Sequence, residues 1–518
     1  MITMKSYLSG RWVEGQGAKT TLLNPSTEEI VADCSTQGLD FKGAVEFARS
    51  RGGTSLRAMT FAARGAMLGR LAKVIGDARE ELITLALSNG GNTRGDAKFD
   101  IDGAALTLNH YAELGAKLGE VKVLADGEGV GLGRGARLFG QHVLTPRHGV
   151  AAHVNAFNFP AWGMGEKAAV ALLAGMPIIA KPATSTALVA FRIAELWVQS
   201  GALPEGAFSF VAGGPGDLLS HLGAQDVLAF TGSSETAHLL RKLDNLAKES
   251  VHVNVEADSL NSAMLGPDAA AGSETLNMFL ADVTRELTQK TGQKCTATRR
   301  VYVPAARLDE VKAALVERLE AVRVGNPVDE KIGMGPVATA QQLRDVRAGI
   351  DRLAASYEVA CGGSRPPEGL AKGFFVAPTL LVNKRPRPDV SDVVNAKEVF
   401  GPVATLMPYD TADQLCALVA AGGGSLVASV YSDDKDFTQA VVSGIAPFHG
   451  RITISTEKIA GQTVSPGTVM PQLLHGGPGR AGGGEELGAL RGLALYLQRT
   501  ALQGPRPFVE AFAGIKPS

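Results

Sequence analysis

Residues 149–185 read GVAAHVNAFNFPAWGMGEKAAVALLAGMPIIAKPATS. A short β-prone run at 150–154 precedes a helical stretch at 162–174, and a second short apolar run follows at 177–180. This is the order of a strand, a helix and a second strand, in which the helix is the crossover that parallel strands need. The segment therefore predicts an α/β fold built on a parallel sheet.

The same alternation continues to residue 256 and then begins again. The first series goes on with a helix at 185–199, strands at 208–211 and 226–230, a helix at 233–246 and a strand at 251–255. The second series has helices at 274–287 and 308–322 and strands at 300–303, 374–382, 426–431 and 452–454. We therefore expect two α/β units, and sheets of this kind bind ligands at the carboxyl ends of their strands.

Three segments lie outside this alternation. Residues 137–144 and 493–502 are strand-like but belong to neither series. Residues 476–484 contain six glycines, which predicts a mobile loop because glycine adds backbone freedom.

The composition excludes several classes of protein. The 518 residues include 51 Lys and Arg against 52 Asp and Glu, a formal charge of −1, so neither nucleic acid nor an anionic membrane is an expected partner. The longest apolar run, 168–180, has 13 residues, whereas a membrane-spanning helix needs about 20. Four scattered cysteines and no histidines at zinc-site spacing predict neither disulfides nor a metal site, and indicate a reducing cytoplasm.

Cys295 stands in Thr291-Gly292-Gln293-Lys294-Cys295-Thr296, among small, polar and basic residues. A neighbouring lysine and the amides of a turn can lower the pKa of a thiol and favour the nucleophilic thiolate. A buried structural cysteine is the alternative that this hexapeptide leaves open. The other three cysteines lack such a setting and are interpreted as structural.

Polar residues follow several of the expected strands. Asn158 comes after the first strand, where it could donate to an oxyanion or form a local turn. Lys181 ends the next strand, and Gly232 and Ser233 open a later helix, as in a phosphate cradle or in ordinary glycine turns. Glu256 ends the last strand of the first series, where it could act as a general base or lie as a solvated acid.

Taken in order, these motifs resemble the aldehyde dehydrogenase superfamily over essentially the whole chain. They are Asn158-Phe159-Pro160, Lys181-Pro182, Phe230-Thr231-Gly232-Ser233, Gly292-Gln293-Lys294-Cys295 and Glu398-Val399-Phe400-Gly401-Pro402. The resemblance implies three parts: a Rossmann-type dinucleotide-binding domain at 1–132 and 149–256, an α/β catalytic domain at 257–484, and a small oligomerisation β-hairpin at 133–148 and 485–518. Such exposed strands need a partner chain, so a homodimer is expected.

The resemblance implies a catalytic role for five residues. Cys295 would attack the aldehyde, while Asn158 and the Cys295 backbone N–H would hold the oxyanion. Glu256 would activate the water that hydrolyses the thioester. Lys167 and Glu486 match a pair that relays protons away from the site in this superfamily.

The resemblance also implies a nicotinamide dinucleotide as cofactor. Lys181 and Ser233 would hold the adenosine ribose and phosphate, and Glu398 and Phe400 would place the nicotinamide ribose and ring. Thr184 stands where members that prefer NAD carry a glutamate, which binds the ribose 2′-OH and repels a 2′-phosphate. A neutral Thr184 beside Lys181 removes that repulsion and can donate a hydrogen bond, so we predict a preference for NADP.

The chain departs from the usual pattern of the superfamily in two further places. Glu256 is followed by Ala257-Asp258-Ser259-Leu260, where Leu-Gly-Gly-Lys is usual. The separation of Glu256 and Cys295, 295 − 256 = 39 positions, implies a small insertion near 268–275.

A finer resemblance points to one branch of the superfamily. The sequence after Glu256, residues 289–296 and His449-Gly450-Arg451-Ile452 are similar to the dehydrogenase half of the bifunctional ring-opening enzyme of phenylacetate degradation. This likeness implies that the substrate is a CoA-linked semialdehyde, oxidised to the acid. The alternatives are another small or aliphatic aldehyde as substrate, or a cysteine thioester hydrolase with no redox step.

Overall fold

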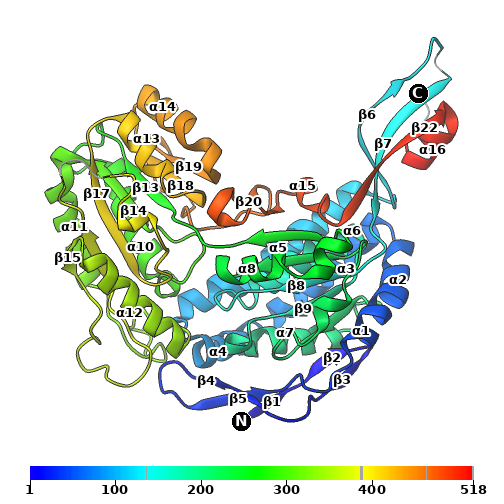
Figure 1. The fold of residues 1–518 in the computed structure, drawn as a ribbon, viewed down its shortest axis with the longest axis horizontal. Helices are drawn as coiled ribbons and strands as arrows, with labels where there is room; N and C mark the ends of the chain where they lie inside the picture. The colour runs from blue at the N-terminus through cyan, green and yellow to red at the C-terminus, as the bar shows by residue number, and fades with distance from the viewer. Residues whose placement is uncertain (136, 386–388, 463, 516–518) are drawn as a thin grey trace.

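The computed structural model describes residues 1–135, 137–385, 389–462 and 464–515. It has two lobes, each built around a seven-stranded sheet, and an arm that projects from one of them (Figure 1). The larger apolar core belongs to the first lobe, and separate cores lie on the two faces of the second sheet. The α/β class predicted from the sequence is confirmed.

The first sheet has five parallel strands with two antiparallel strands at one edge. The parallel strands are β8 (Ala151–Val154), β9 (Ile178–Lys181), β10 (Phe208–Phe210), β11 (Val227–Thr231) and β12 (His252–Glu256), and their order is β12-β11-β8-β9-β10. The edge strands are β2 (Ser6–Leu8) and β3 (Arg11–Val13). The direction of the chain across the sheet reverses between β8 and β11, which is where Rossmann-type sheets bind ligands.

Helix α6 (Trp162–Ala174) packs under this reversal point, and the sequence explains why. All of its residues except Gly163 and Glu166 are buried, because the helix is apolar on nearly every side. Gly175 ends the helix with φ of 93°, a conformation that glycine adopts without strain. The helix predicted at 162–174 is confirmed, and it carries Lys167 into the interior.

The second sheet has the order β15-β16-β17-β14-β13-β18-β19, with β15 the one antiparallel strand. Its strands are β13 (Ser262–Leu265), β14 (Arg300–Pro304), β15 (Glu358–Cys361), β16 (Thr379–Val382), β17 (Val403–Tyr409), β18 (Ser425–Tyr431) and β19 (His449–Ser455). Its principal helices are α10 (Glu274–Thr288), α11 (Leu308–Glu320), α12 (Ala340–Ala354), α13 (Ala412–Ala420) and α14 (Lys435–Ile445). The predicted domain boundary at residue 256 falls in the connection from β12 to β13.

Helices of the N-terminal third pack against the first sheet. The helices are α3 (Phe61–Asp77), α4 (Arg79–Gly90) and α5 (Arg94–Leu118), and α7 (Leu188–Gln199) lies with them. Gly65 and Gly115 let α3 and α5 approach closely, because a Cβ on Gly65 would lie 2.7 Å from the Ala112 carbonyl oxygen. Helix α5 begins with a capping box of Thr93 and Asp96.

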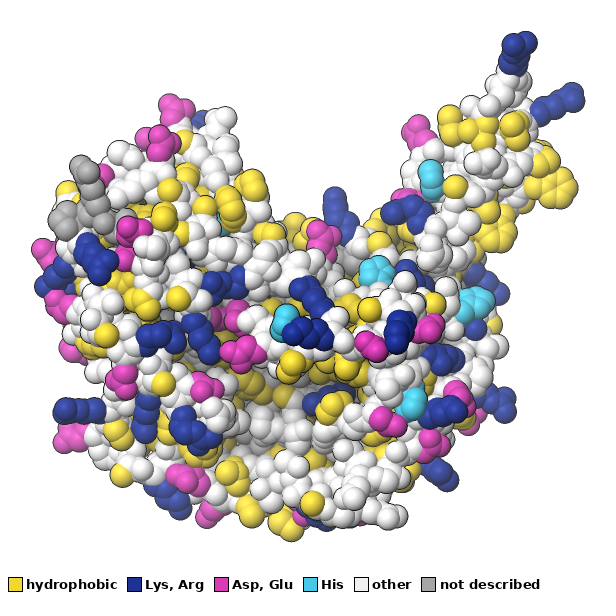
Figure 2. All heavy atoms as spheres, in the orientation of Figure 1, with side chains coloured by type: hydrophobic (Ala, Val, Ile, Leu, Met, Phe, Trp, Pro, Cys, Tyr) yellow, Lys and Arg dark blue, Asp and Glu magenta, His cyan; other side chains and the backbone are white. Residues whose placement is uncertain are grey.

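The arm is a three-stranded sheet with a short helix. Its strands are β6 (Leu124–Gly131), β7 (Leu138–Pro146) and β22 (Leu497–Pro505), in the order β22-β7-β6, and the helix is α16 (Arg506–Ala513). The predicted hairpin segment at 133–148 was therefore too short, since β6 joins the arm before residue 132. Figure 2 shows hydrophobic side chains along the arm, and Leu138 and Phe508 are exposed to 47% and 77%.

Three predicted elements differ from the structure. The helix expected at 233–246 is two helices, α8 (Ser234–Arg241) and α9 (Asp244–Lys248). The strand expected from residue 374 begins only at Thr379. The helix expected from residue 185 begins as a 3-10 turn, Thr184–Thr186, before α7.

The glycine-rich segment 476–484, for which the sequence predicted a mobile loop, is packed and hydrogen-bonded in the structure. It joins β20 (Leu474–Gly476) to β21 (Glu485–Leu487), which pair with each other. Gly484 N donates to the Val255 carbonyl at 3.0 Å, and Ala257 N donates to the Ala481 carbonyl at 2.9 Å. Glycine is needed here for close approach to β12 rather than for mobility.

Replacing Gly484 should reveal this close approach. A Cβ at Gly484 would lie 2.4 Å from the Val255 carbonyl oxygen, so Gly484→Ala is expected to destabilise the protein by about 1–3 kcal/mol. Thermal melting measures the effect. Gly76→Ala in α3 is the control, because its Cβ meets nothing within 4 Å and alanine favours a helix. Equal melting temperatures for Gly484→Ala and the parent would contradict the packing described.

Candidate active site

A pocket of about 480 Å³ lies at the carboxyl ends of β8, β11 and β12. It brings together side chains that are far apart in the sequence: Asn158, Phe159, Trp162, Glu166, Lys167, Thr231, Glu256, Cys295, Thr296, Val469 and His475. Asn158, Glu256 and Cys295, which the sequence analysis singled out in separate motifs, thus line one pocket.

The backbone that presents Cys295 is a strained turn held from several sides. Lys290 and Thr291 have φ of 53° and 57°, a left-handed conformation that side chains other than glycine rarely adopt. Asp96 accepts a hydrogen bond of 2.9 Å from Lys290 N, and Gly292 lies so close to the Gly401 carbonyl that a Cβ would be 2.3 Å from it. Strained backbone at a site indicates pre-organisation of the groups it carries.

Lys294 does not face the Cys295 thiol, although the sequence suggested that this lysine could lower the pKa of that thiol. Its ammonium is fully buried and pairs with Glu286 at 2.9 Å, and it donates to Gln289 Oε1 at 2.8 Å. Glu286 also accepts a hydrogen bond from Gly467 N at 3.2 Å, so the pair ties the Cys295 turn to a pocket wall. Adjacent side chains of a turn point in different directions, which the sequence does not reveal.

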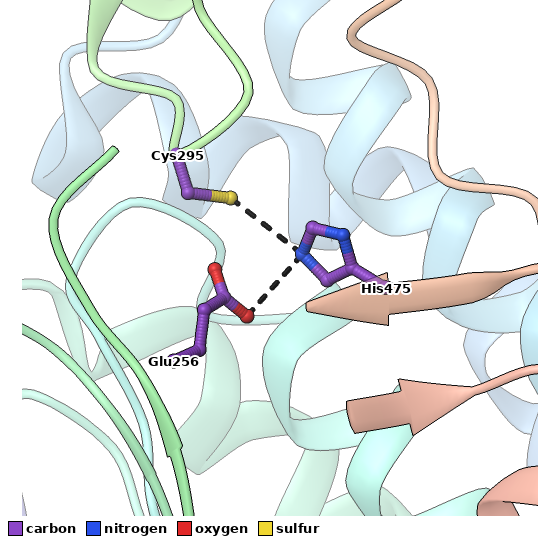
Figure 3. A group of neighbouring side chains, drawn as sticks. All are labelled: Glu256, Cys295 and His475. Atoms are coloured by element: carbon purple, nitrogen blue, oxygen red, sulfur yellow. Dashed lines mark hydrogen bonds and ion pairs between the residues drawn. The ribbon is translucent and has the colours of Figure 1, made fainter. Parts of the chain in front are cut away.

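Glu256 and His475 form a buried ion pair beside Cys295 (Figure 3). His475 Nε2 lies 3.2 Å from Glu256 Oε2 and 3.8 Å from Cys295 Sγ. The side chains of His475 and Glu256 are only 4% and 3% exposed. Glu256 Oε1 is buried and has no hydrogen-bond partner among the described residues.

The charges of this cluster shift one another. Burial opposes the charge of Glu256, but His475, together with Lys167 and the Cys295 thiol, outweighs burial and lowers the pKa of Glu256 to about 2. Burial likewise opposes the charge of His475, but Glu256 raises the pKa of that imidazole above its ordinary value. Burial and the Glu256 charge raise the pKa of the Cys295 thiol well above its usual range. Glu256 is therefore ionised at neutral pH, and the resting thiol is protonated.

Sequence reasoning missed His475. Its motif, a histidine before two glycines, has no metal spacing and no predicted partner, and its contact arises only because β20 folds back towards β12. The three donor atoms of Glu256, Cys295 and His475 all lie within 4.8 Å of one another, and they are also ligand types of zinc. Among the described residues this is the one such group, whereas the sequence predicted no metal site.

Two asparagines lie close to Cys295: Asn158 shares its pocket, and Asn261 binds its backbone. Asn158 lines the pocket with Cys295, and its side-chain N–H₂ is the kind of donor that stabilises an oxyanion. Asn261 Nδ2 donates to the Cys295 carbonyl at 2.7 Å and to the Ala297 carbonyl at 2.9 Å. Asn261 therefore fixes the backbone of the nucleophile, a role that the sequence did not indicate.

Lys167 and Glu486 meet behind the pocket, as the resemblance implied. Lys167 Nζ lies 3.0 Å from Glu486 Oε2 and 3.4 Å from Glu166 Oε1, and it donates to Thr231 Oγ1 at 2.9 Å. Burial opposes its charge, but Glu486 and Glu166 raise the pKa of Lys167 above its ordinary value. Burial raises the pKa of Glu166 to about 7, which suits a group that exchanges protons near neutral pH.

The residues expected to bind the adenosine half lie along the next strand ends. Lys181 ends β9, and Thr184 follows it in a 3-10 turn. Burial lowers the pKa of Lys181, and no carboxylate in the described part of the chain lies within ion-pair distance of its ammonium. A partly buried cation of this kind fits a phosphate or ribose of a dinucleotide.

Gly232 and Ser233 lead into α8, with Ser233 as its N-cap. The Ser233 hydroxyl accepts a hydrogen bond of 3.2 Å from Thr236 N, and Gly232 N donates to the Glu256 carbonyl at 3.1 Å. Asp258 accepts from Ser234 N at 3.0 Å and thereby occupies one amide at the start of α8. This contact is the structural consequence of the unusual residues after Glu256.

Glu398 and Phe400 lie just before β17 and contact Arg299. Arg299 Nε lies 2.9 Å from Glu398 Oε1, and its guanidinium is 5.3 Å from the centre of the Phe400 ring. Ser259 N also donates to Glu398 Oε2 at 2.9 Å. Burial raises the pKa of Glu398, and its charge in turn raises the pKa of Cys295.

Comparison with known proteins agrees with this geometry. The aldehyde dehydrogenase family model matches residues 12–500, so the chain belongs to that family. It is 43% identical over 479 residues to the 3,4-dehydroadipyl-CoA semialdehyde dehydrogenase of Aromatoleum evansii, across 92% of this chain and 93% of that relative. No helix in the described residues is long and apolar enough to cross a membrane.

Solved structures of the family share the fold. An aldehyde dehydrogenase from Bacillus cereus in complex with NAD⁺ matches with a TM-score of 0.84 and 25% identity, over 97% of this chain and 96% of that one. A betaine aldehyde dehydrogenase from Staphylococcus aureus in complex with NAD⁺ matches with a TM-score of 0.83 and 24% identity, over 97% and 96%. The protein is therefore an aldehyde dehydrogenase, a class that uses a nicotinamide dinucleotide.

Breaking the Lys294–Glu286 pair should destabilise the protein strongly. Lys294→Met leaves Glu286 as an uncompensated buried charge, so a loss of about 3–5 kcal/mol in unfolding free energy is expected. Glu286→Gln/Lys294→Met leaves no charge behind and is expected to recover part of that loss. Melting temperatures of the two variants test this, and an equal loss in both would contradict it.

Proposed function

We propose that this protein is an NADP-dependent, non-acylating dehydrogenase that oxidises a CoA-linked semialdehyde to the carboxylic acid. The observation that carries the proposal is the single pocket in which Cys295 faces Asn158 and Glu256. A nucleophile, an oxyanion donor and a carboxylate with a free oxygen are the groups that aldehyde oxidation through a thioester requires. Membership of the aldehyde dehydrogenase family supports the same reaction class.

The proposed reaction uses the groups in turn. The Cys295 thiolate attacks the aldehyde carbon, and the Asn158 side chain with the Cys295 backbone N–H stabilises the oxyanion of the thiohemiacetal. The bound dinucleotide supplies the acceptor for the hydride, and the sulfur is left as a thioester. Glu256 then takes a proton from the water that attacks the thioester, through the Oε1 atom that lacks a partner.

Protons leave the pocket through the buried charges behind it in this proposal. Glu166 lines the pocket and contacts Lys167, which in turn contacts Glu486. A carboxyl with a pKa of about 7 beside a lysine can accept a proton and release it within the working range of the enzyme. We propose Lys167 and Glu486 as the outer members of this relay.

The proposed cofactor preference rests on Lys181 and Thr184. The partly buried Lys181 supplies a cation without a carboxylate at ion-pair distance in the described chain, and Thr184 adds no negative charge beside it. A 2′-phosphate would meet attraction there and no repulsion. Ser233 and Gly232, with Glu398 and Phe400 at the other end, are proposed to place the rest of the dinucleotide.

The proposed substrate rests on the similarity to one relative and on a second groove. The relative from Aromatoleum evansii is named for 3,4-dehydroadipyl-CoA semialdehyde. We propose the same substrate for this chain, within the aerobic degradation of an aromatic acid. A groove lined by Phe99, Leu106 and His110 shares Trp162 and Val469 with the catalytic pocket. We propose this neighbouring groove as the place where the long acyl part of the substrate binds. We propose in addition a cytoplasmic homodimer joined through the arm.

A substrate panel with NADP⁺ tests the proposal. Absorbance at 340 nm should rise with CoA-linked semialdehydes and rise much more slowly with short free aldehydes. Cys295→Ala should abolish the reaction and keep NADP⁺ binding. Acid formed without reduced cofactor would instead support a thioester hydrolase. Equal rates on short free aldehydes would overturn the CoA-linked assignment while leaving the reaction class in place.

Introducing a carboxylate at position 184 should reverse the cofactor preference. Thr184→Glu places a negative charge where the 2′-phosphate is proposed to bind, so kcat/KM for NADP⁺ is expected to fall at least tenfold. The value for NAD⁺ should change much less or rise. Thr184→Gln is the matched control, since it has the same size without the charge. A parent enzyme that prefers NAD⁺ would contradict the cofactor proposal outright.

A further inference from the structure

His475 is the buried group in contact with the sulfur whose function the reaction above leaves open. It comes from β20, on the opposite side of the pocket from the Cys295 turn, and its ring points at both Cys295 and Glu256 (Figure 3). One ring nitrogen, Nε2, serves both contacts, at 3.2 Å to Glu256 Oε2 and 3.8 Å to Cys295 Sγ. The same N–H therefore faces both Glu256 and Cys295, and the second ring nitrogen takes part in neither contact.

The charges around Cys295 disfavour a thiolate. The carboxylates of Glu256, Glu166 and Glu398 surround the sulfur, and each makes a further negative charge there costly. The thiolate is nevertheless the form that attacks carbonyl carbon. A compensating positive charge is therefore required at the pocket.

Three of the other cations near the site are paired with carboxylates, and the fourth, Arg451, makes no hydrogen bond to the sulfur among the described residues. Lys294 pairs with Glu286, Arg299 with Glu398, and Lys167 with Glu486, all at 2.9–3.0 Å. Arg451 donates to the Pro466 carbonyl at 2.7 Å, and no hydrogen bond to Cys295 is found for it in the described chain. Among the described residues, His475 is thus the ionisable cation whose hydrogen-bonding atom contacts the sulfur.

We propose that His475, in its protonated form, stabilises the Cys295 thiolate and holds Glu256 beside it, and so acts as a positioning residue for the nucleophile. When Cys295 ionises, the sulfur keeps the S–H electron pair and the proton passes to water in the pocket. The imidazolium keeps its own proton, and Nε2–H donates to both the sulfur and Glu256 Oε2. Cys295 as nucleophile belongs to the proposed function, on which this inference rests.

The charged groups that face His475 support its protonated form on balance. Glu256 on β12 and Glu166 on α6 favour the imidazolium, whereas Arg451 on β19 opposes it. Glu256 is the one of these in direct contact with the ring. Glu256 thus stabilises the protonated form of His475, and protonated His475 in turn stabilises the Cys295 thiolate.

Alkylation of Cys295 by iodoacetamide at pH values from 6 to 10 tests this without any substrate. The fraction modified at Cys295 is measured by peptide mass spectrometry, with Cys416, distant from His475 in the second lobe, as the internal reference. His475→Gln keeps a polar side chain of similar size but removes the charge. We expect its rate profile at Cys295 to move at least one pH unit upwards, with at least a tenfold slower rate at pH 7.

Two further variants separate charge from shape. His475→Phe removes charge and hydrogen bonding together and should shift the profile at least as far as His475→Gln. Arg451→Gln removes a nearby cation that does not contact the sulfur and should shift it much less. Melting temperature and NADP⁺ binding of each variant show that the fold is kept, and His475→Gln decides the matter if His475→Phe does not fold.

An unchanged alkylation profile in folded His475→Gln overturns the inference, and so does a larger shift in Arg451→Gln. Neither outcome depends on the aldehyde, since no substrate is present. If the profile shifts as expected but Cys295→Ala still oxidises aldehydes, then the proposed function fails and the charge relation between His475 and Cys295 stands. The two failures are therefore distinguishable.

Discussion

The pairing of buried carboxylates with buried cations is the constraint on which this active site depends. Isolated buried charges are costly, and four carboxylates lie in or around the pocket with their own cations: Glu256 with His475, Glu286 with Lys294, Glu398 with Arg299, and Glu486 with Lys167. Removing any one partner would leave a buried charge without a counter-charge, because the neighbouring cations and carboxylates are already paired. The position of the thiol is set within this arrangement rather than by apolar packing alone.

These pairs also join parts of the chain that are far apart in the sequence. Glu256 ends a strand of the first sheet, while His475 lies beyond the last strand of the second. Glu286 on α10 binds Lys294 in the Cys295 turn and the backbone at Gly467, so it links that turn to a wall of the pocket. The glycine-rich segment seals the arrangement by hydrogen-bonding to β12 at Val255. The pocket is complete only when both lobes have formed.

Much of this was accessible from the sequence because strand ends are local features. Alternating strands and helices place Asn158, Lys181 and Glu256 at one sheet edge, and resemblance identified Cys295 among four cysteines. The role of His475 could not be predicted from the sequence, because its contacts with Glu256 and Cys295 arise only when β20 folds back towards β12. The glycine-rich segment was misinterpreted for a related reason: glycine signals both freedom and close approach, and only the neighbouring Val255 backbone distinguishes them.

The two half-reactions of the proposed cycle place opposite demands on Glu256. Ionisation of Cys295 needs a charged His475, and Glu256 supplies that through the 3.2 Å contact of Oε2. The same contact lowers the pKa of Glu256 to about 2, which keeps it ionised but makes it a weak proton acceptor for water. Once the sulfur is a thioester it no longer needs the imidazolium. The hydrolytic role proposed for Glu256 therefore requires a weaker Glu256–His475 contact than this structure shows, because only then does the carboxylate regain basicity.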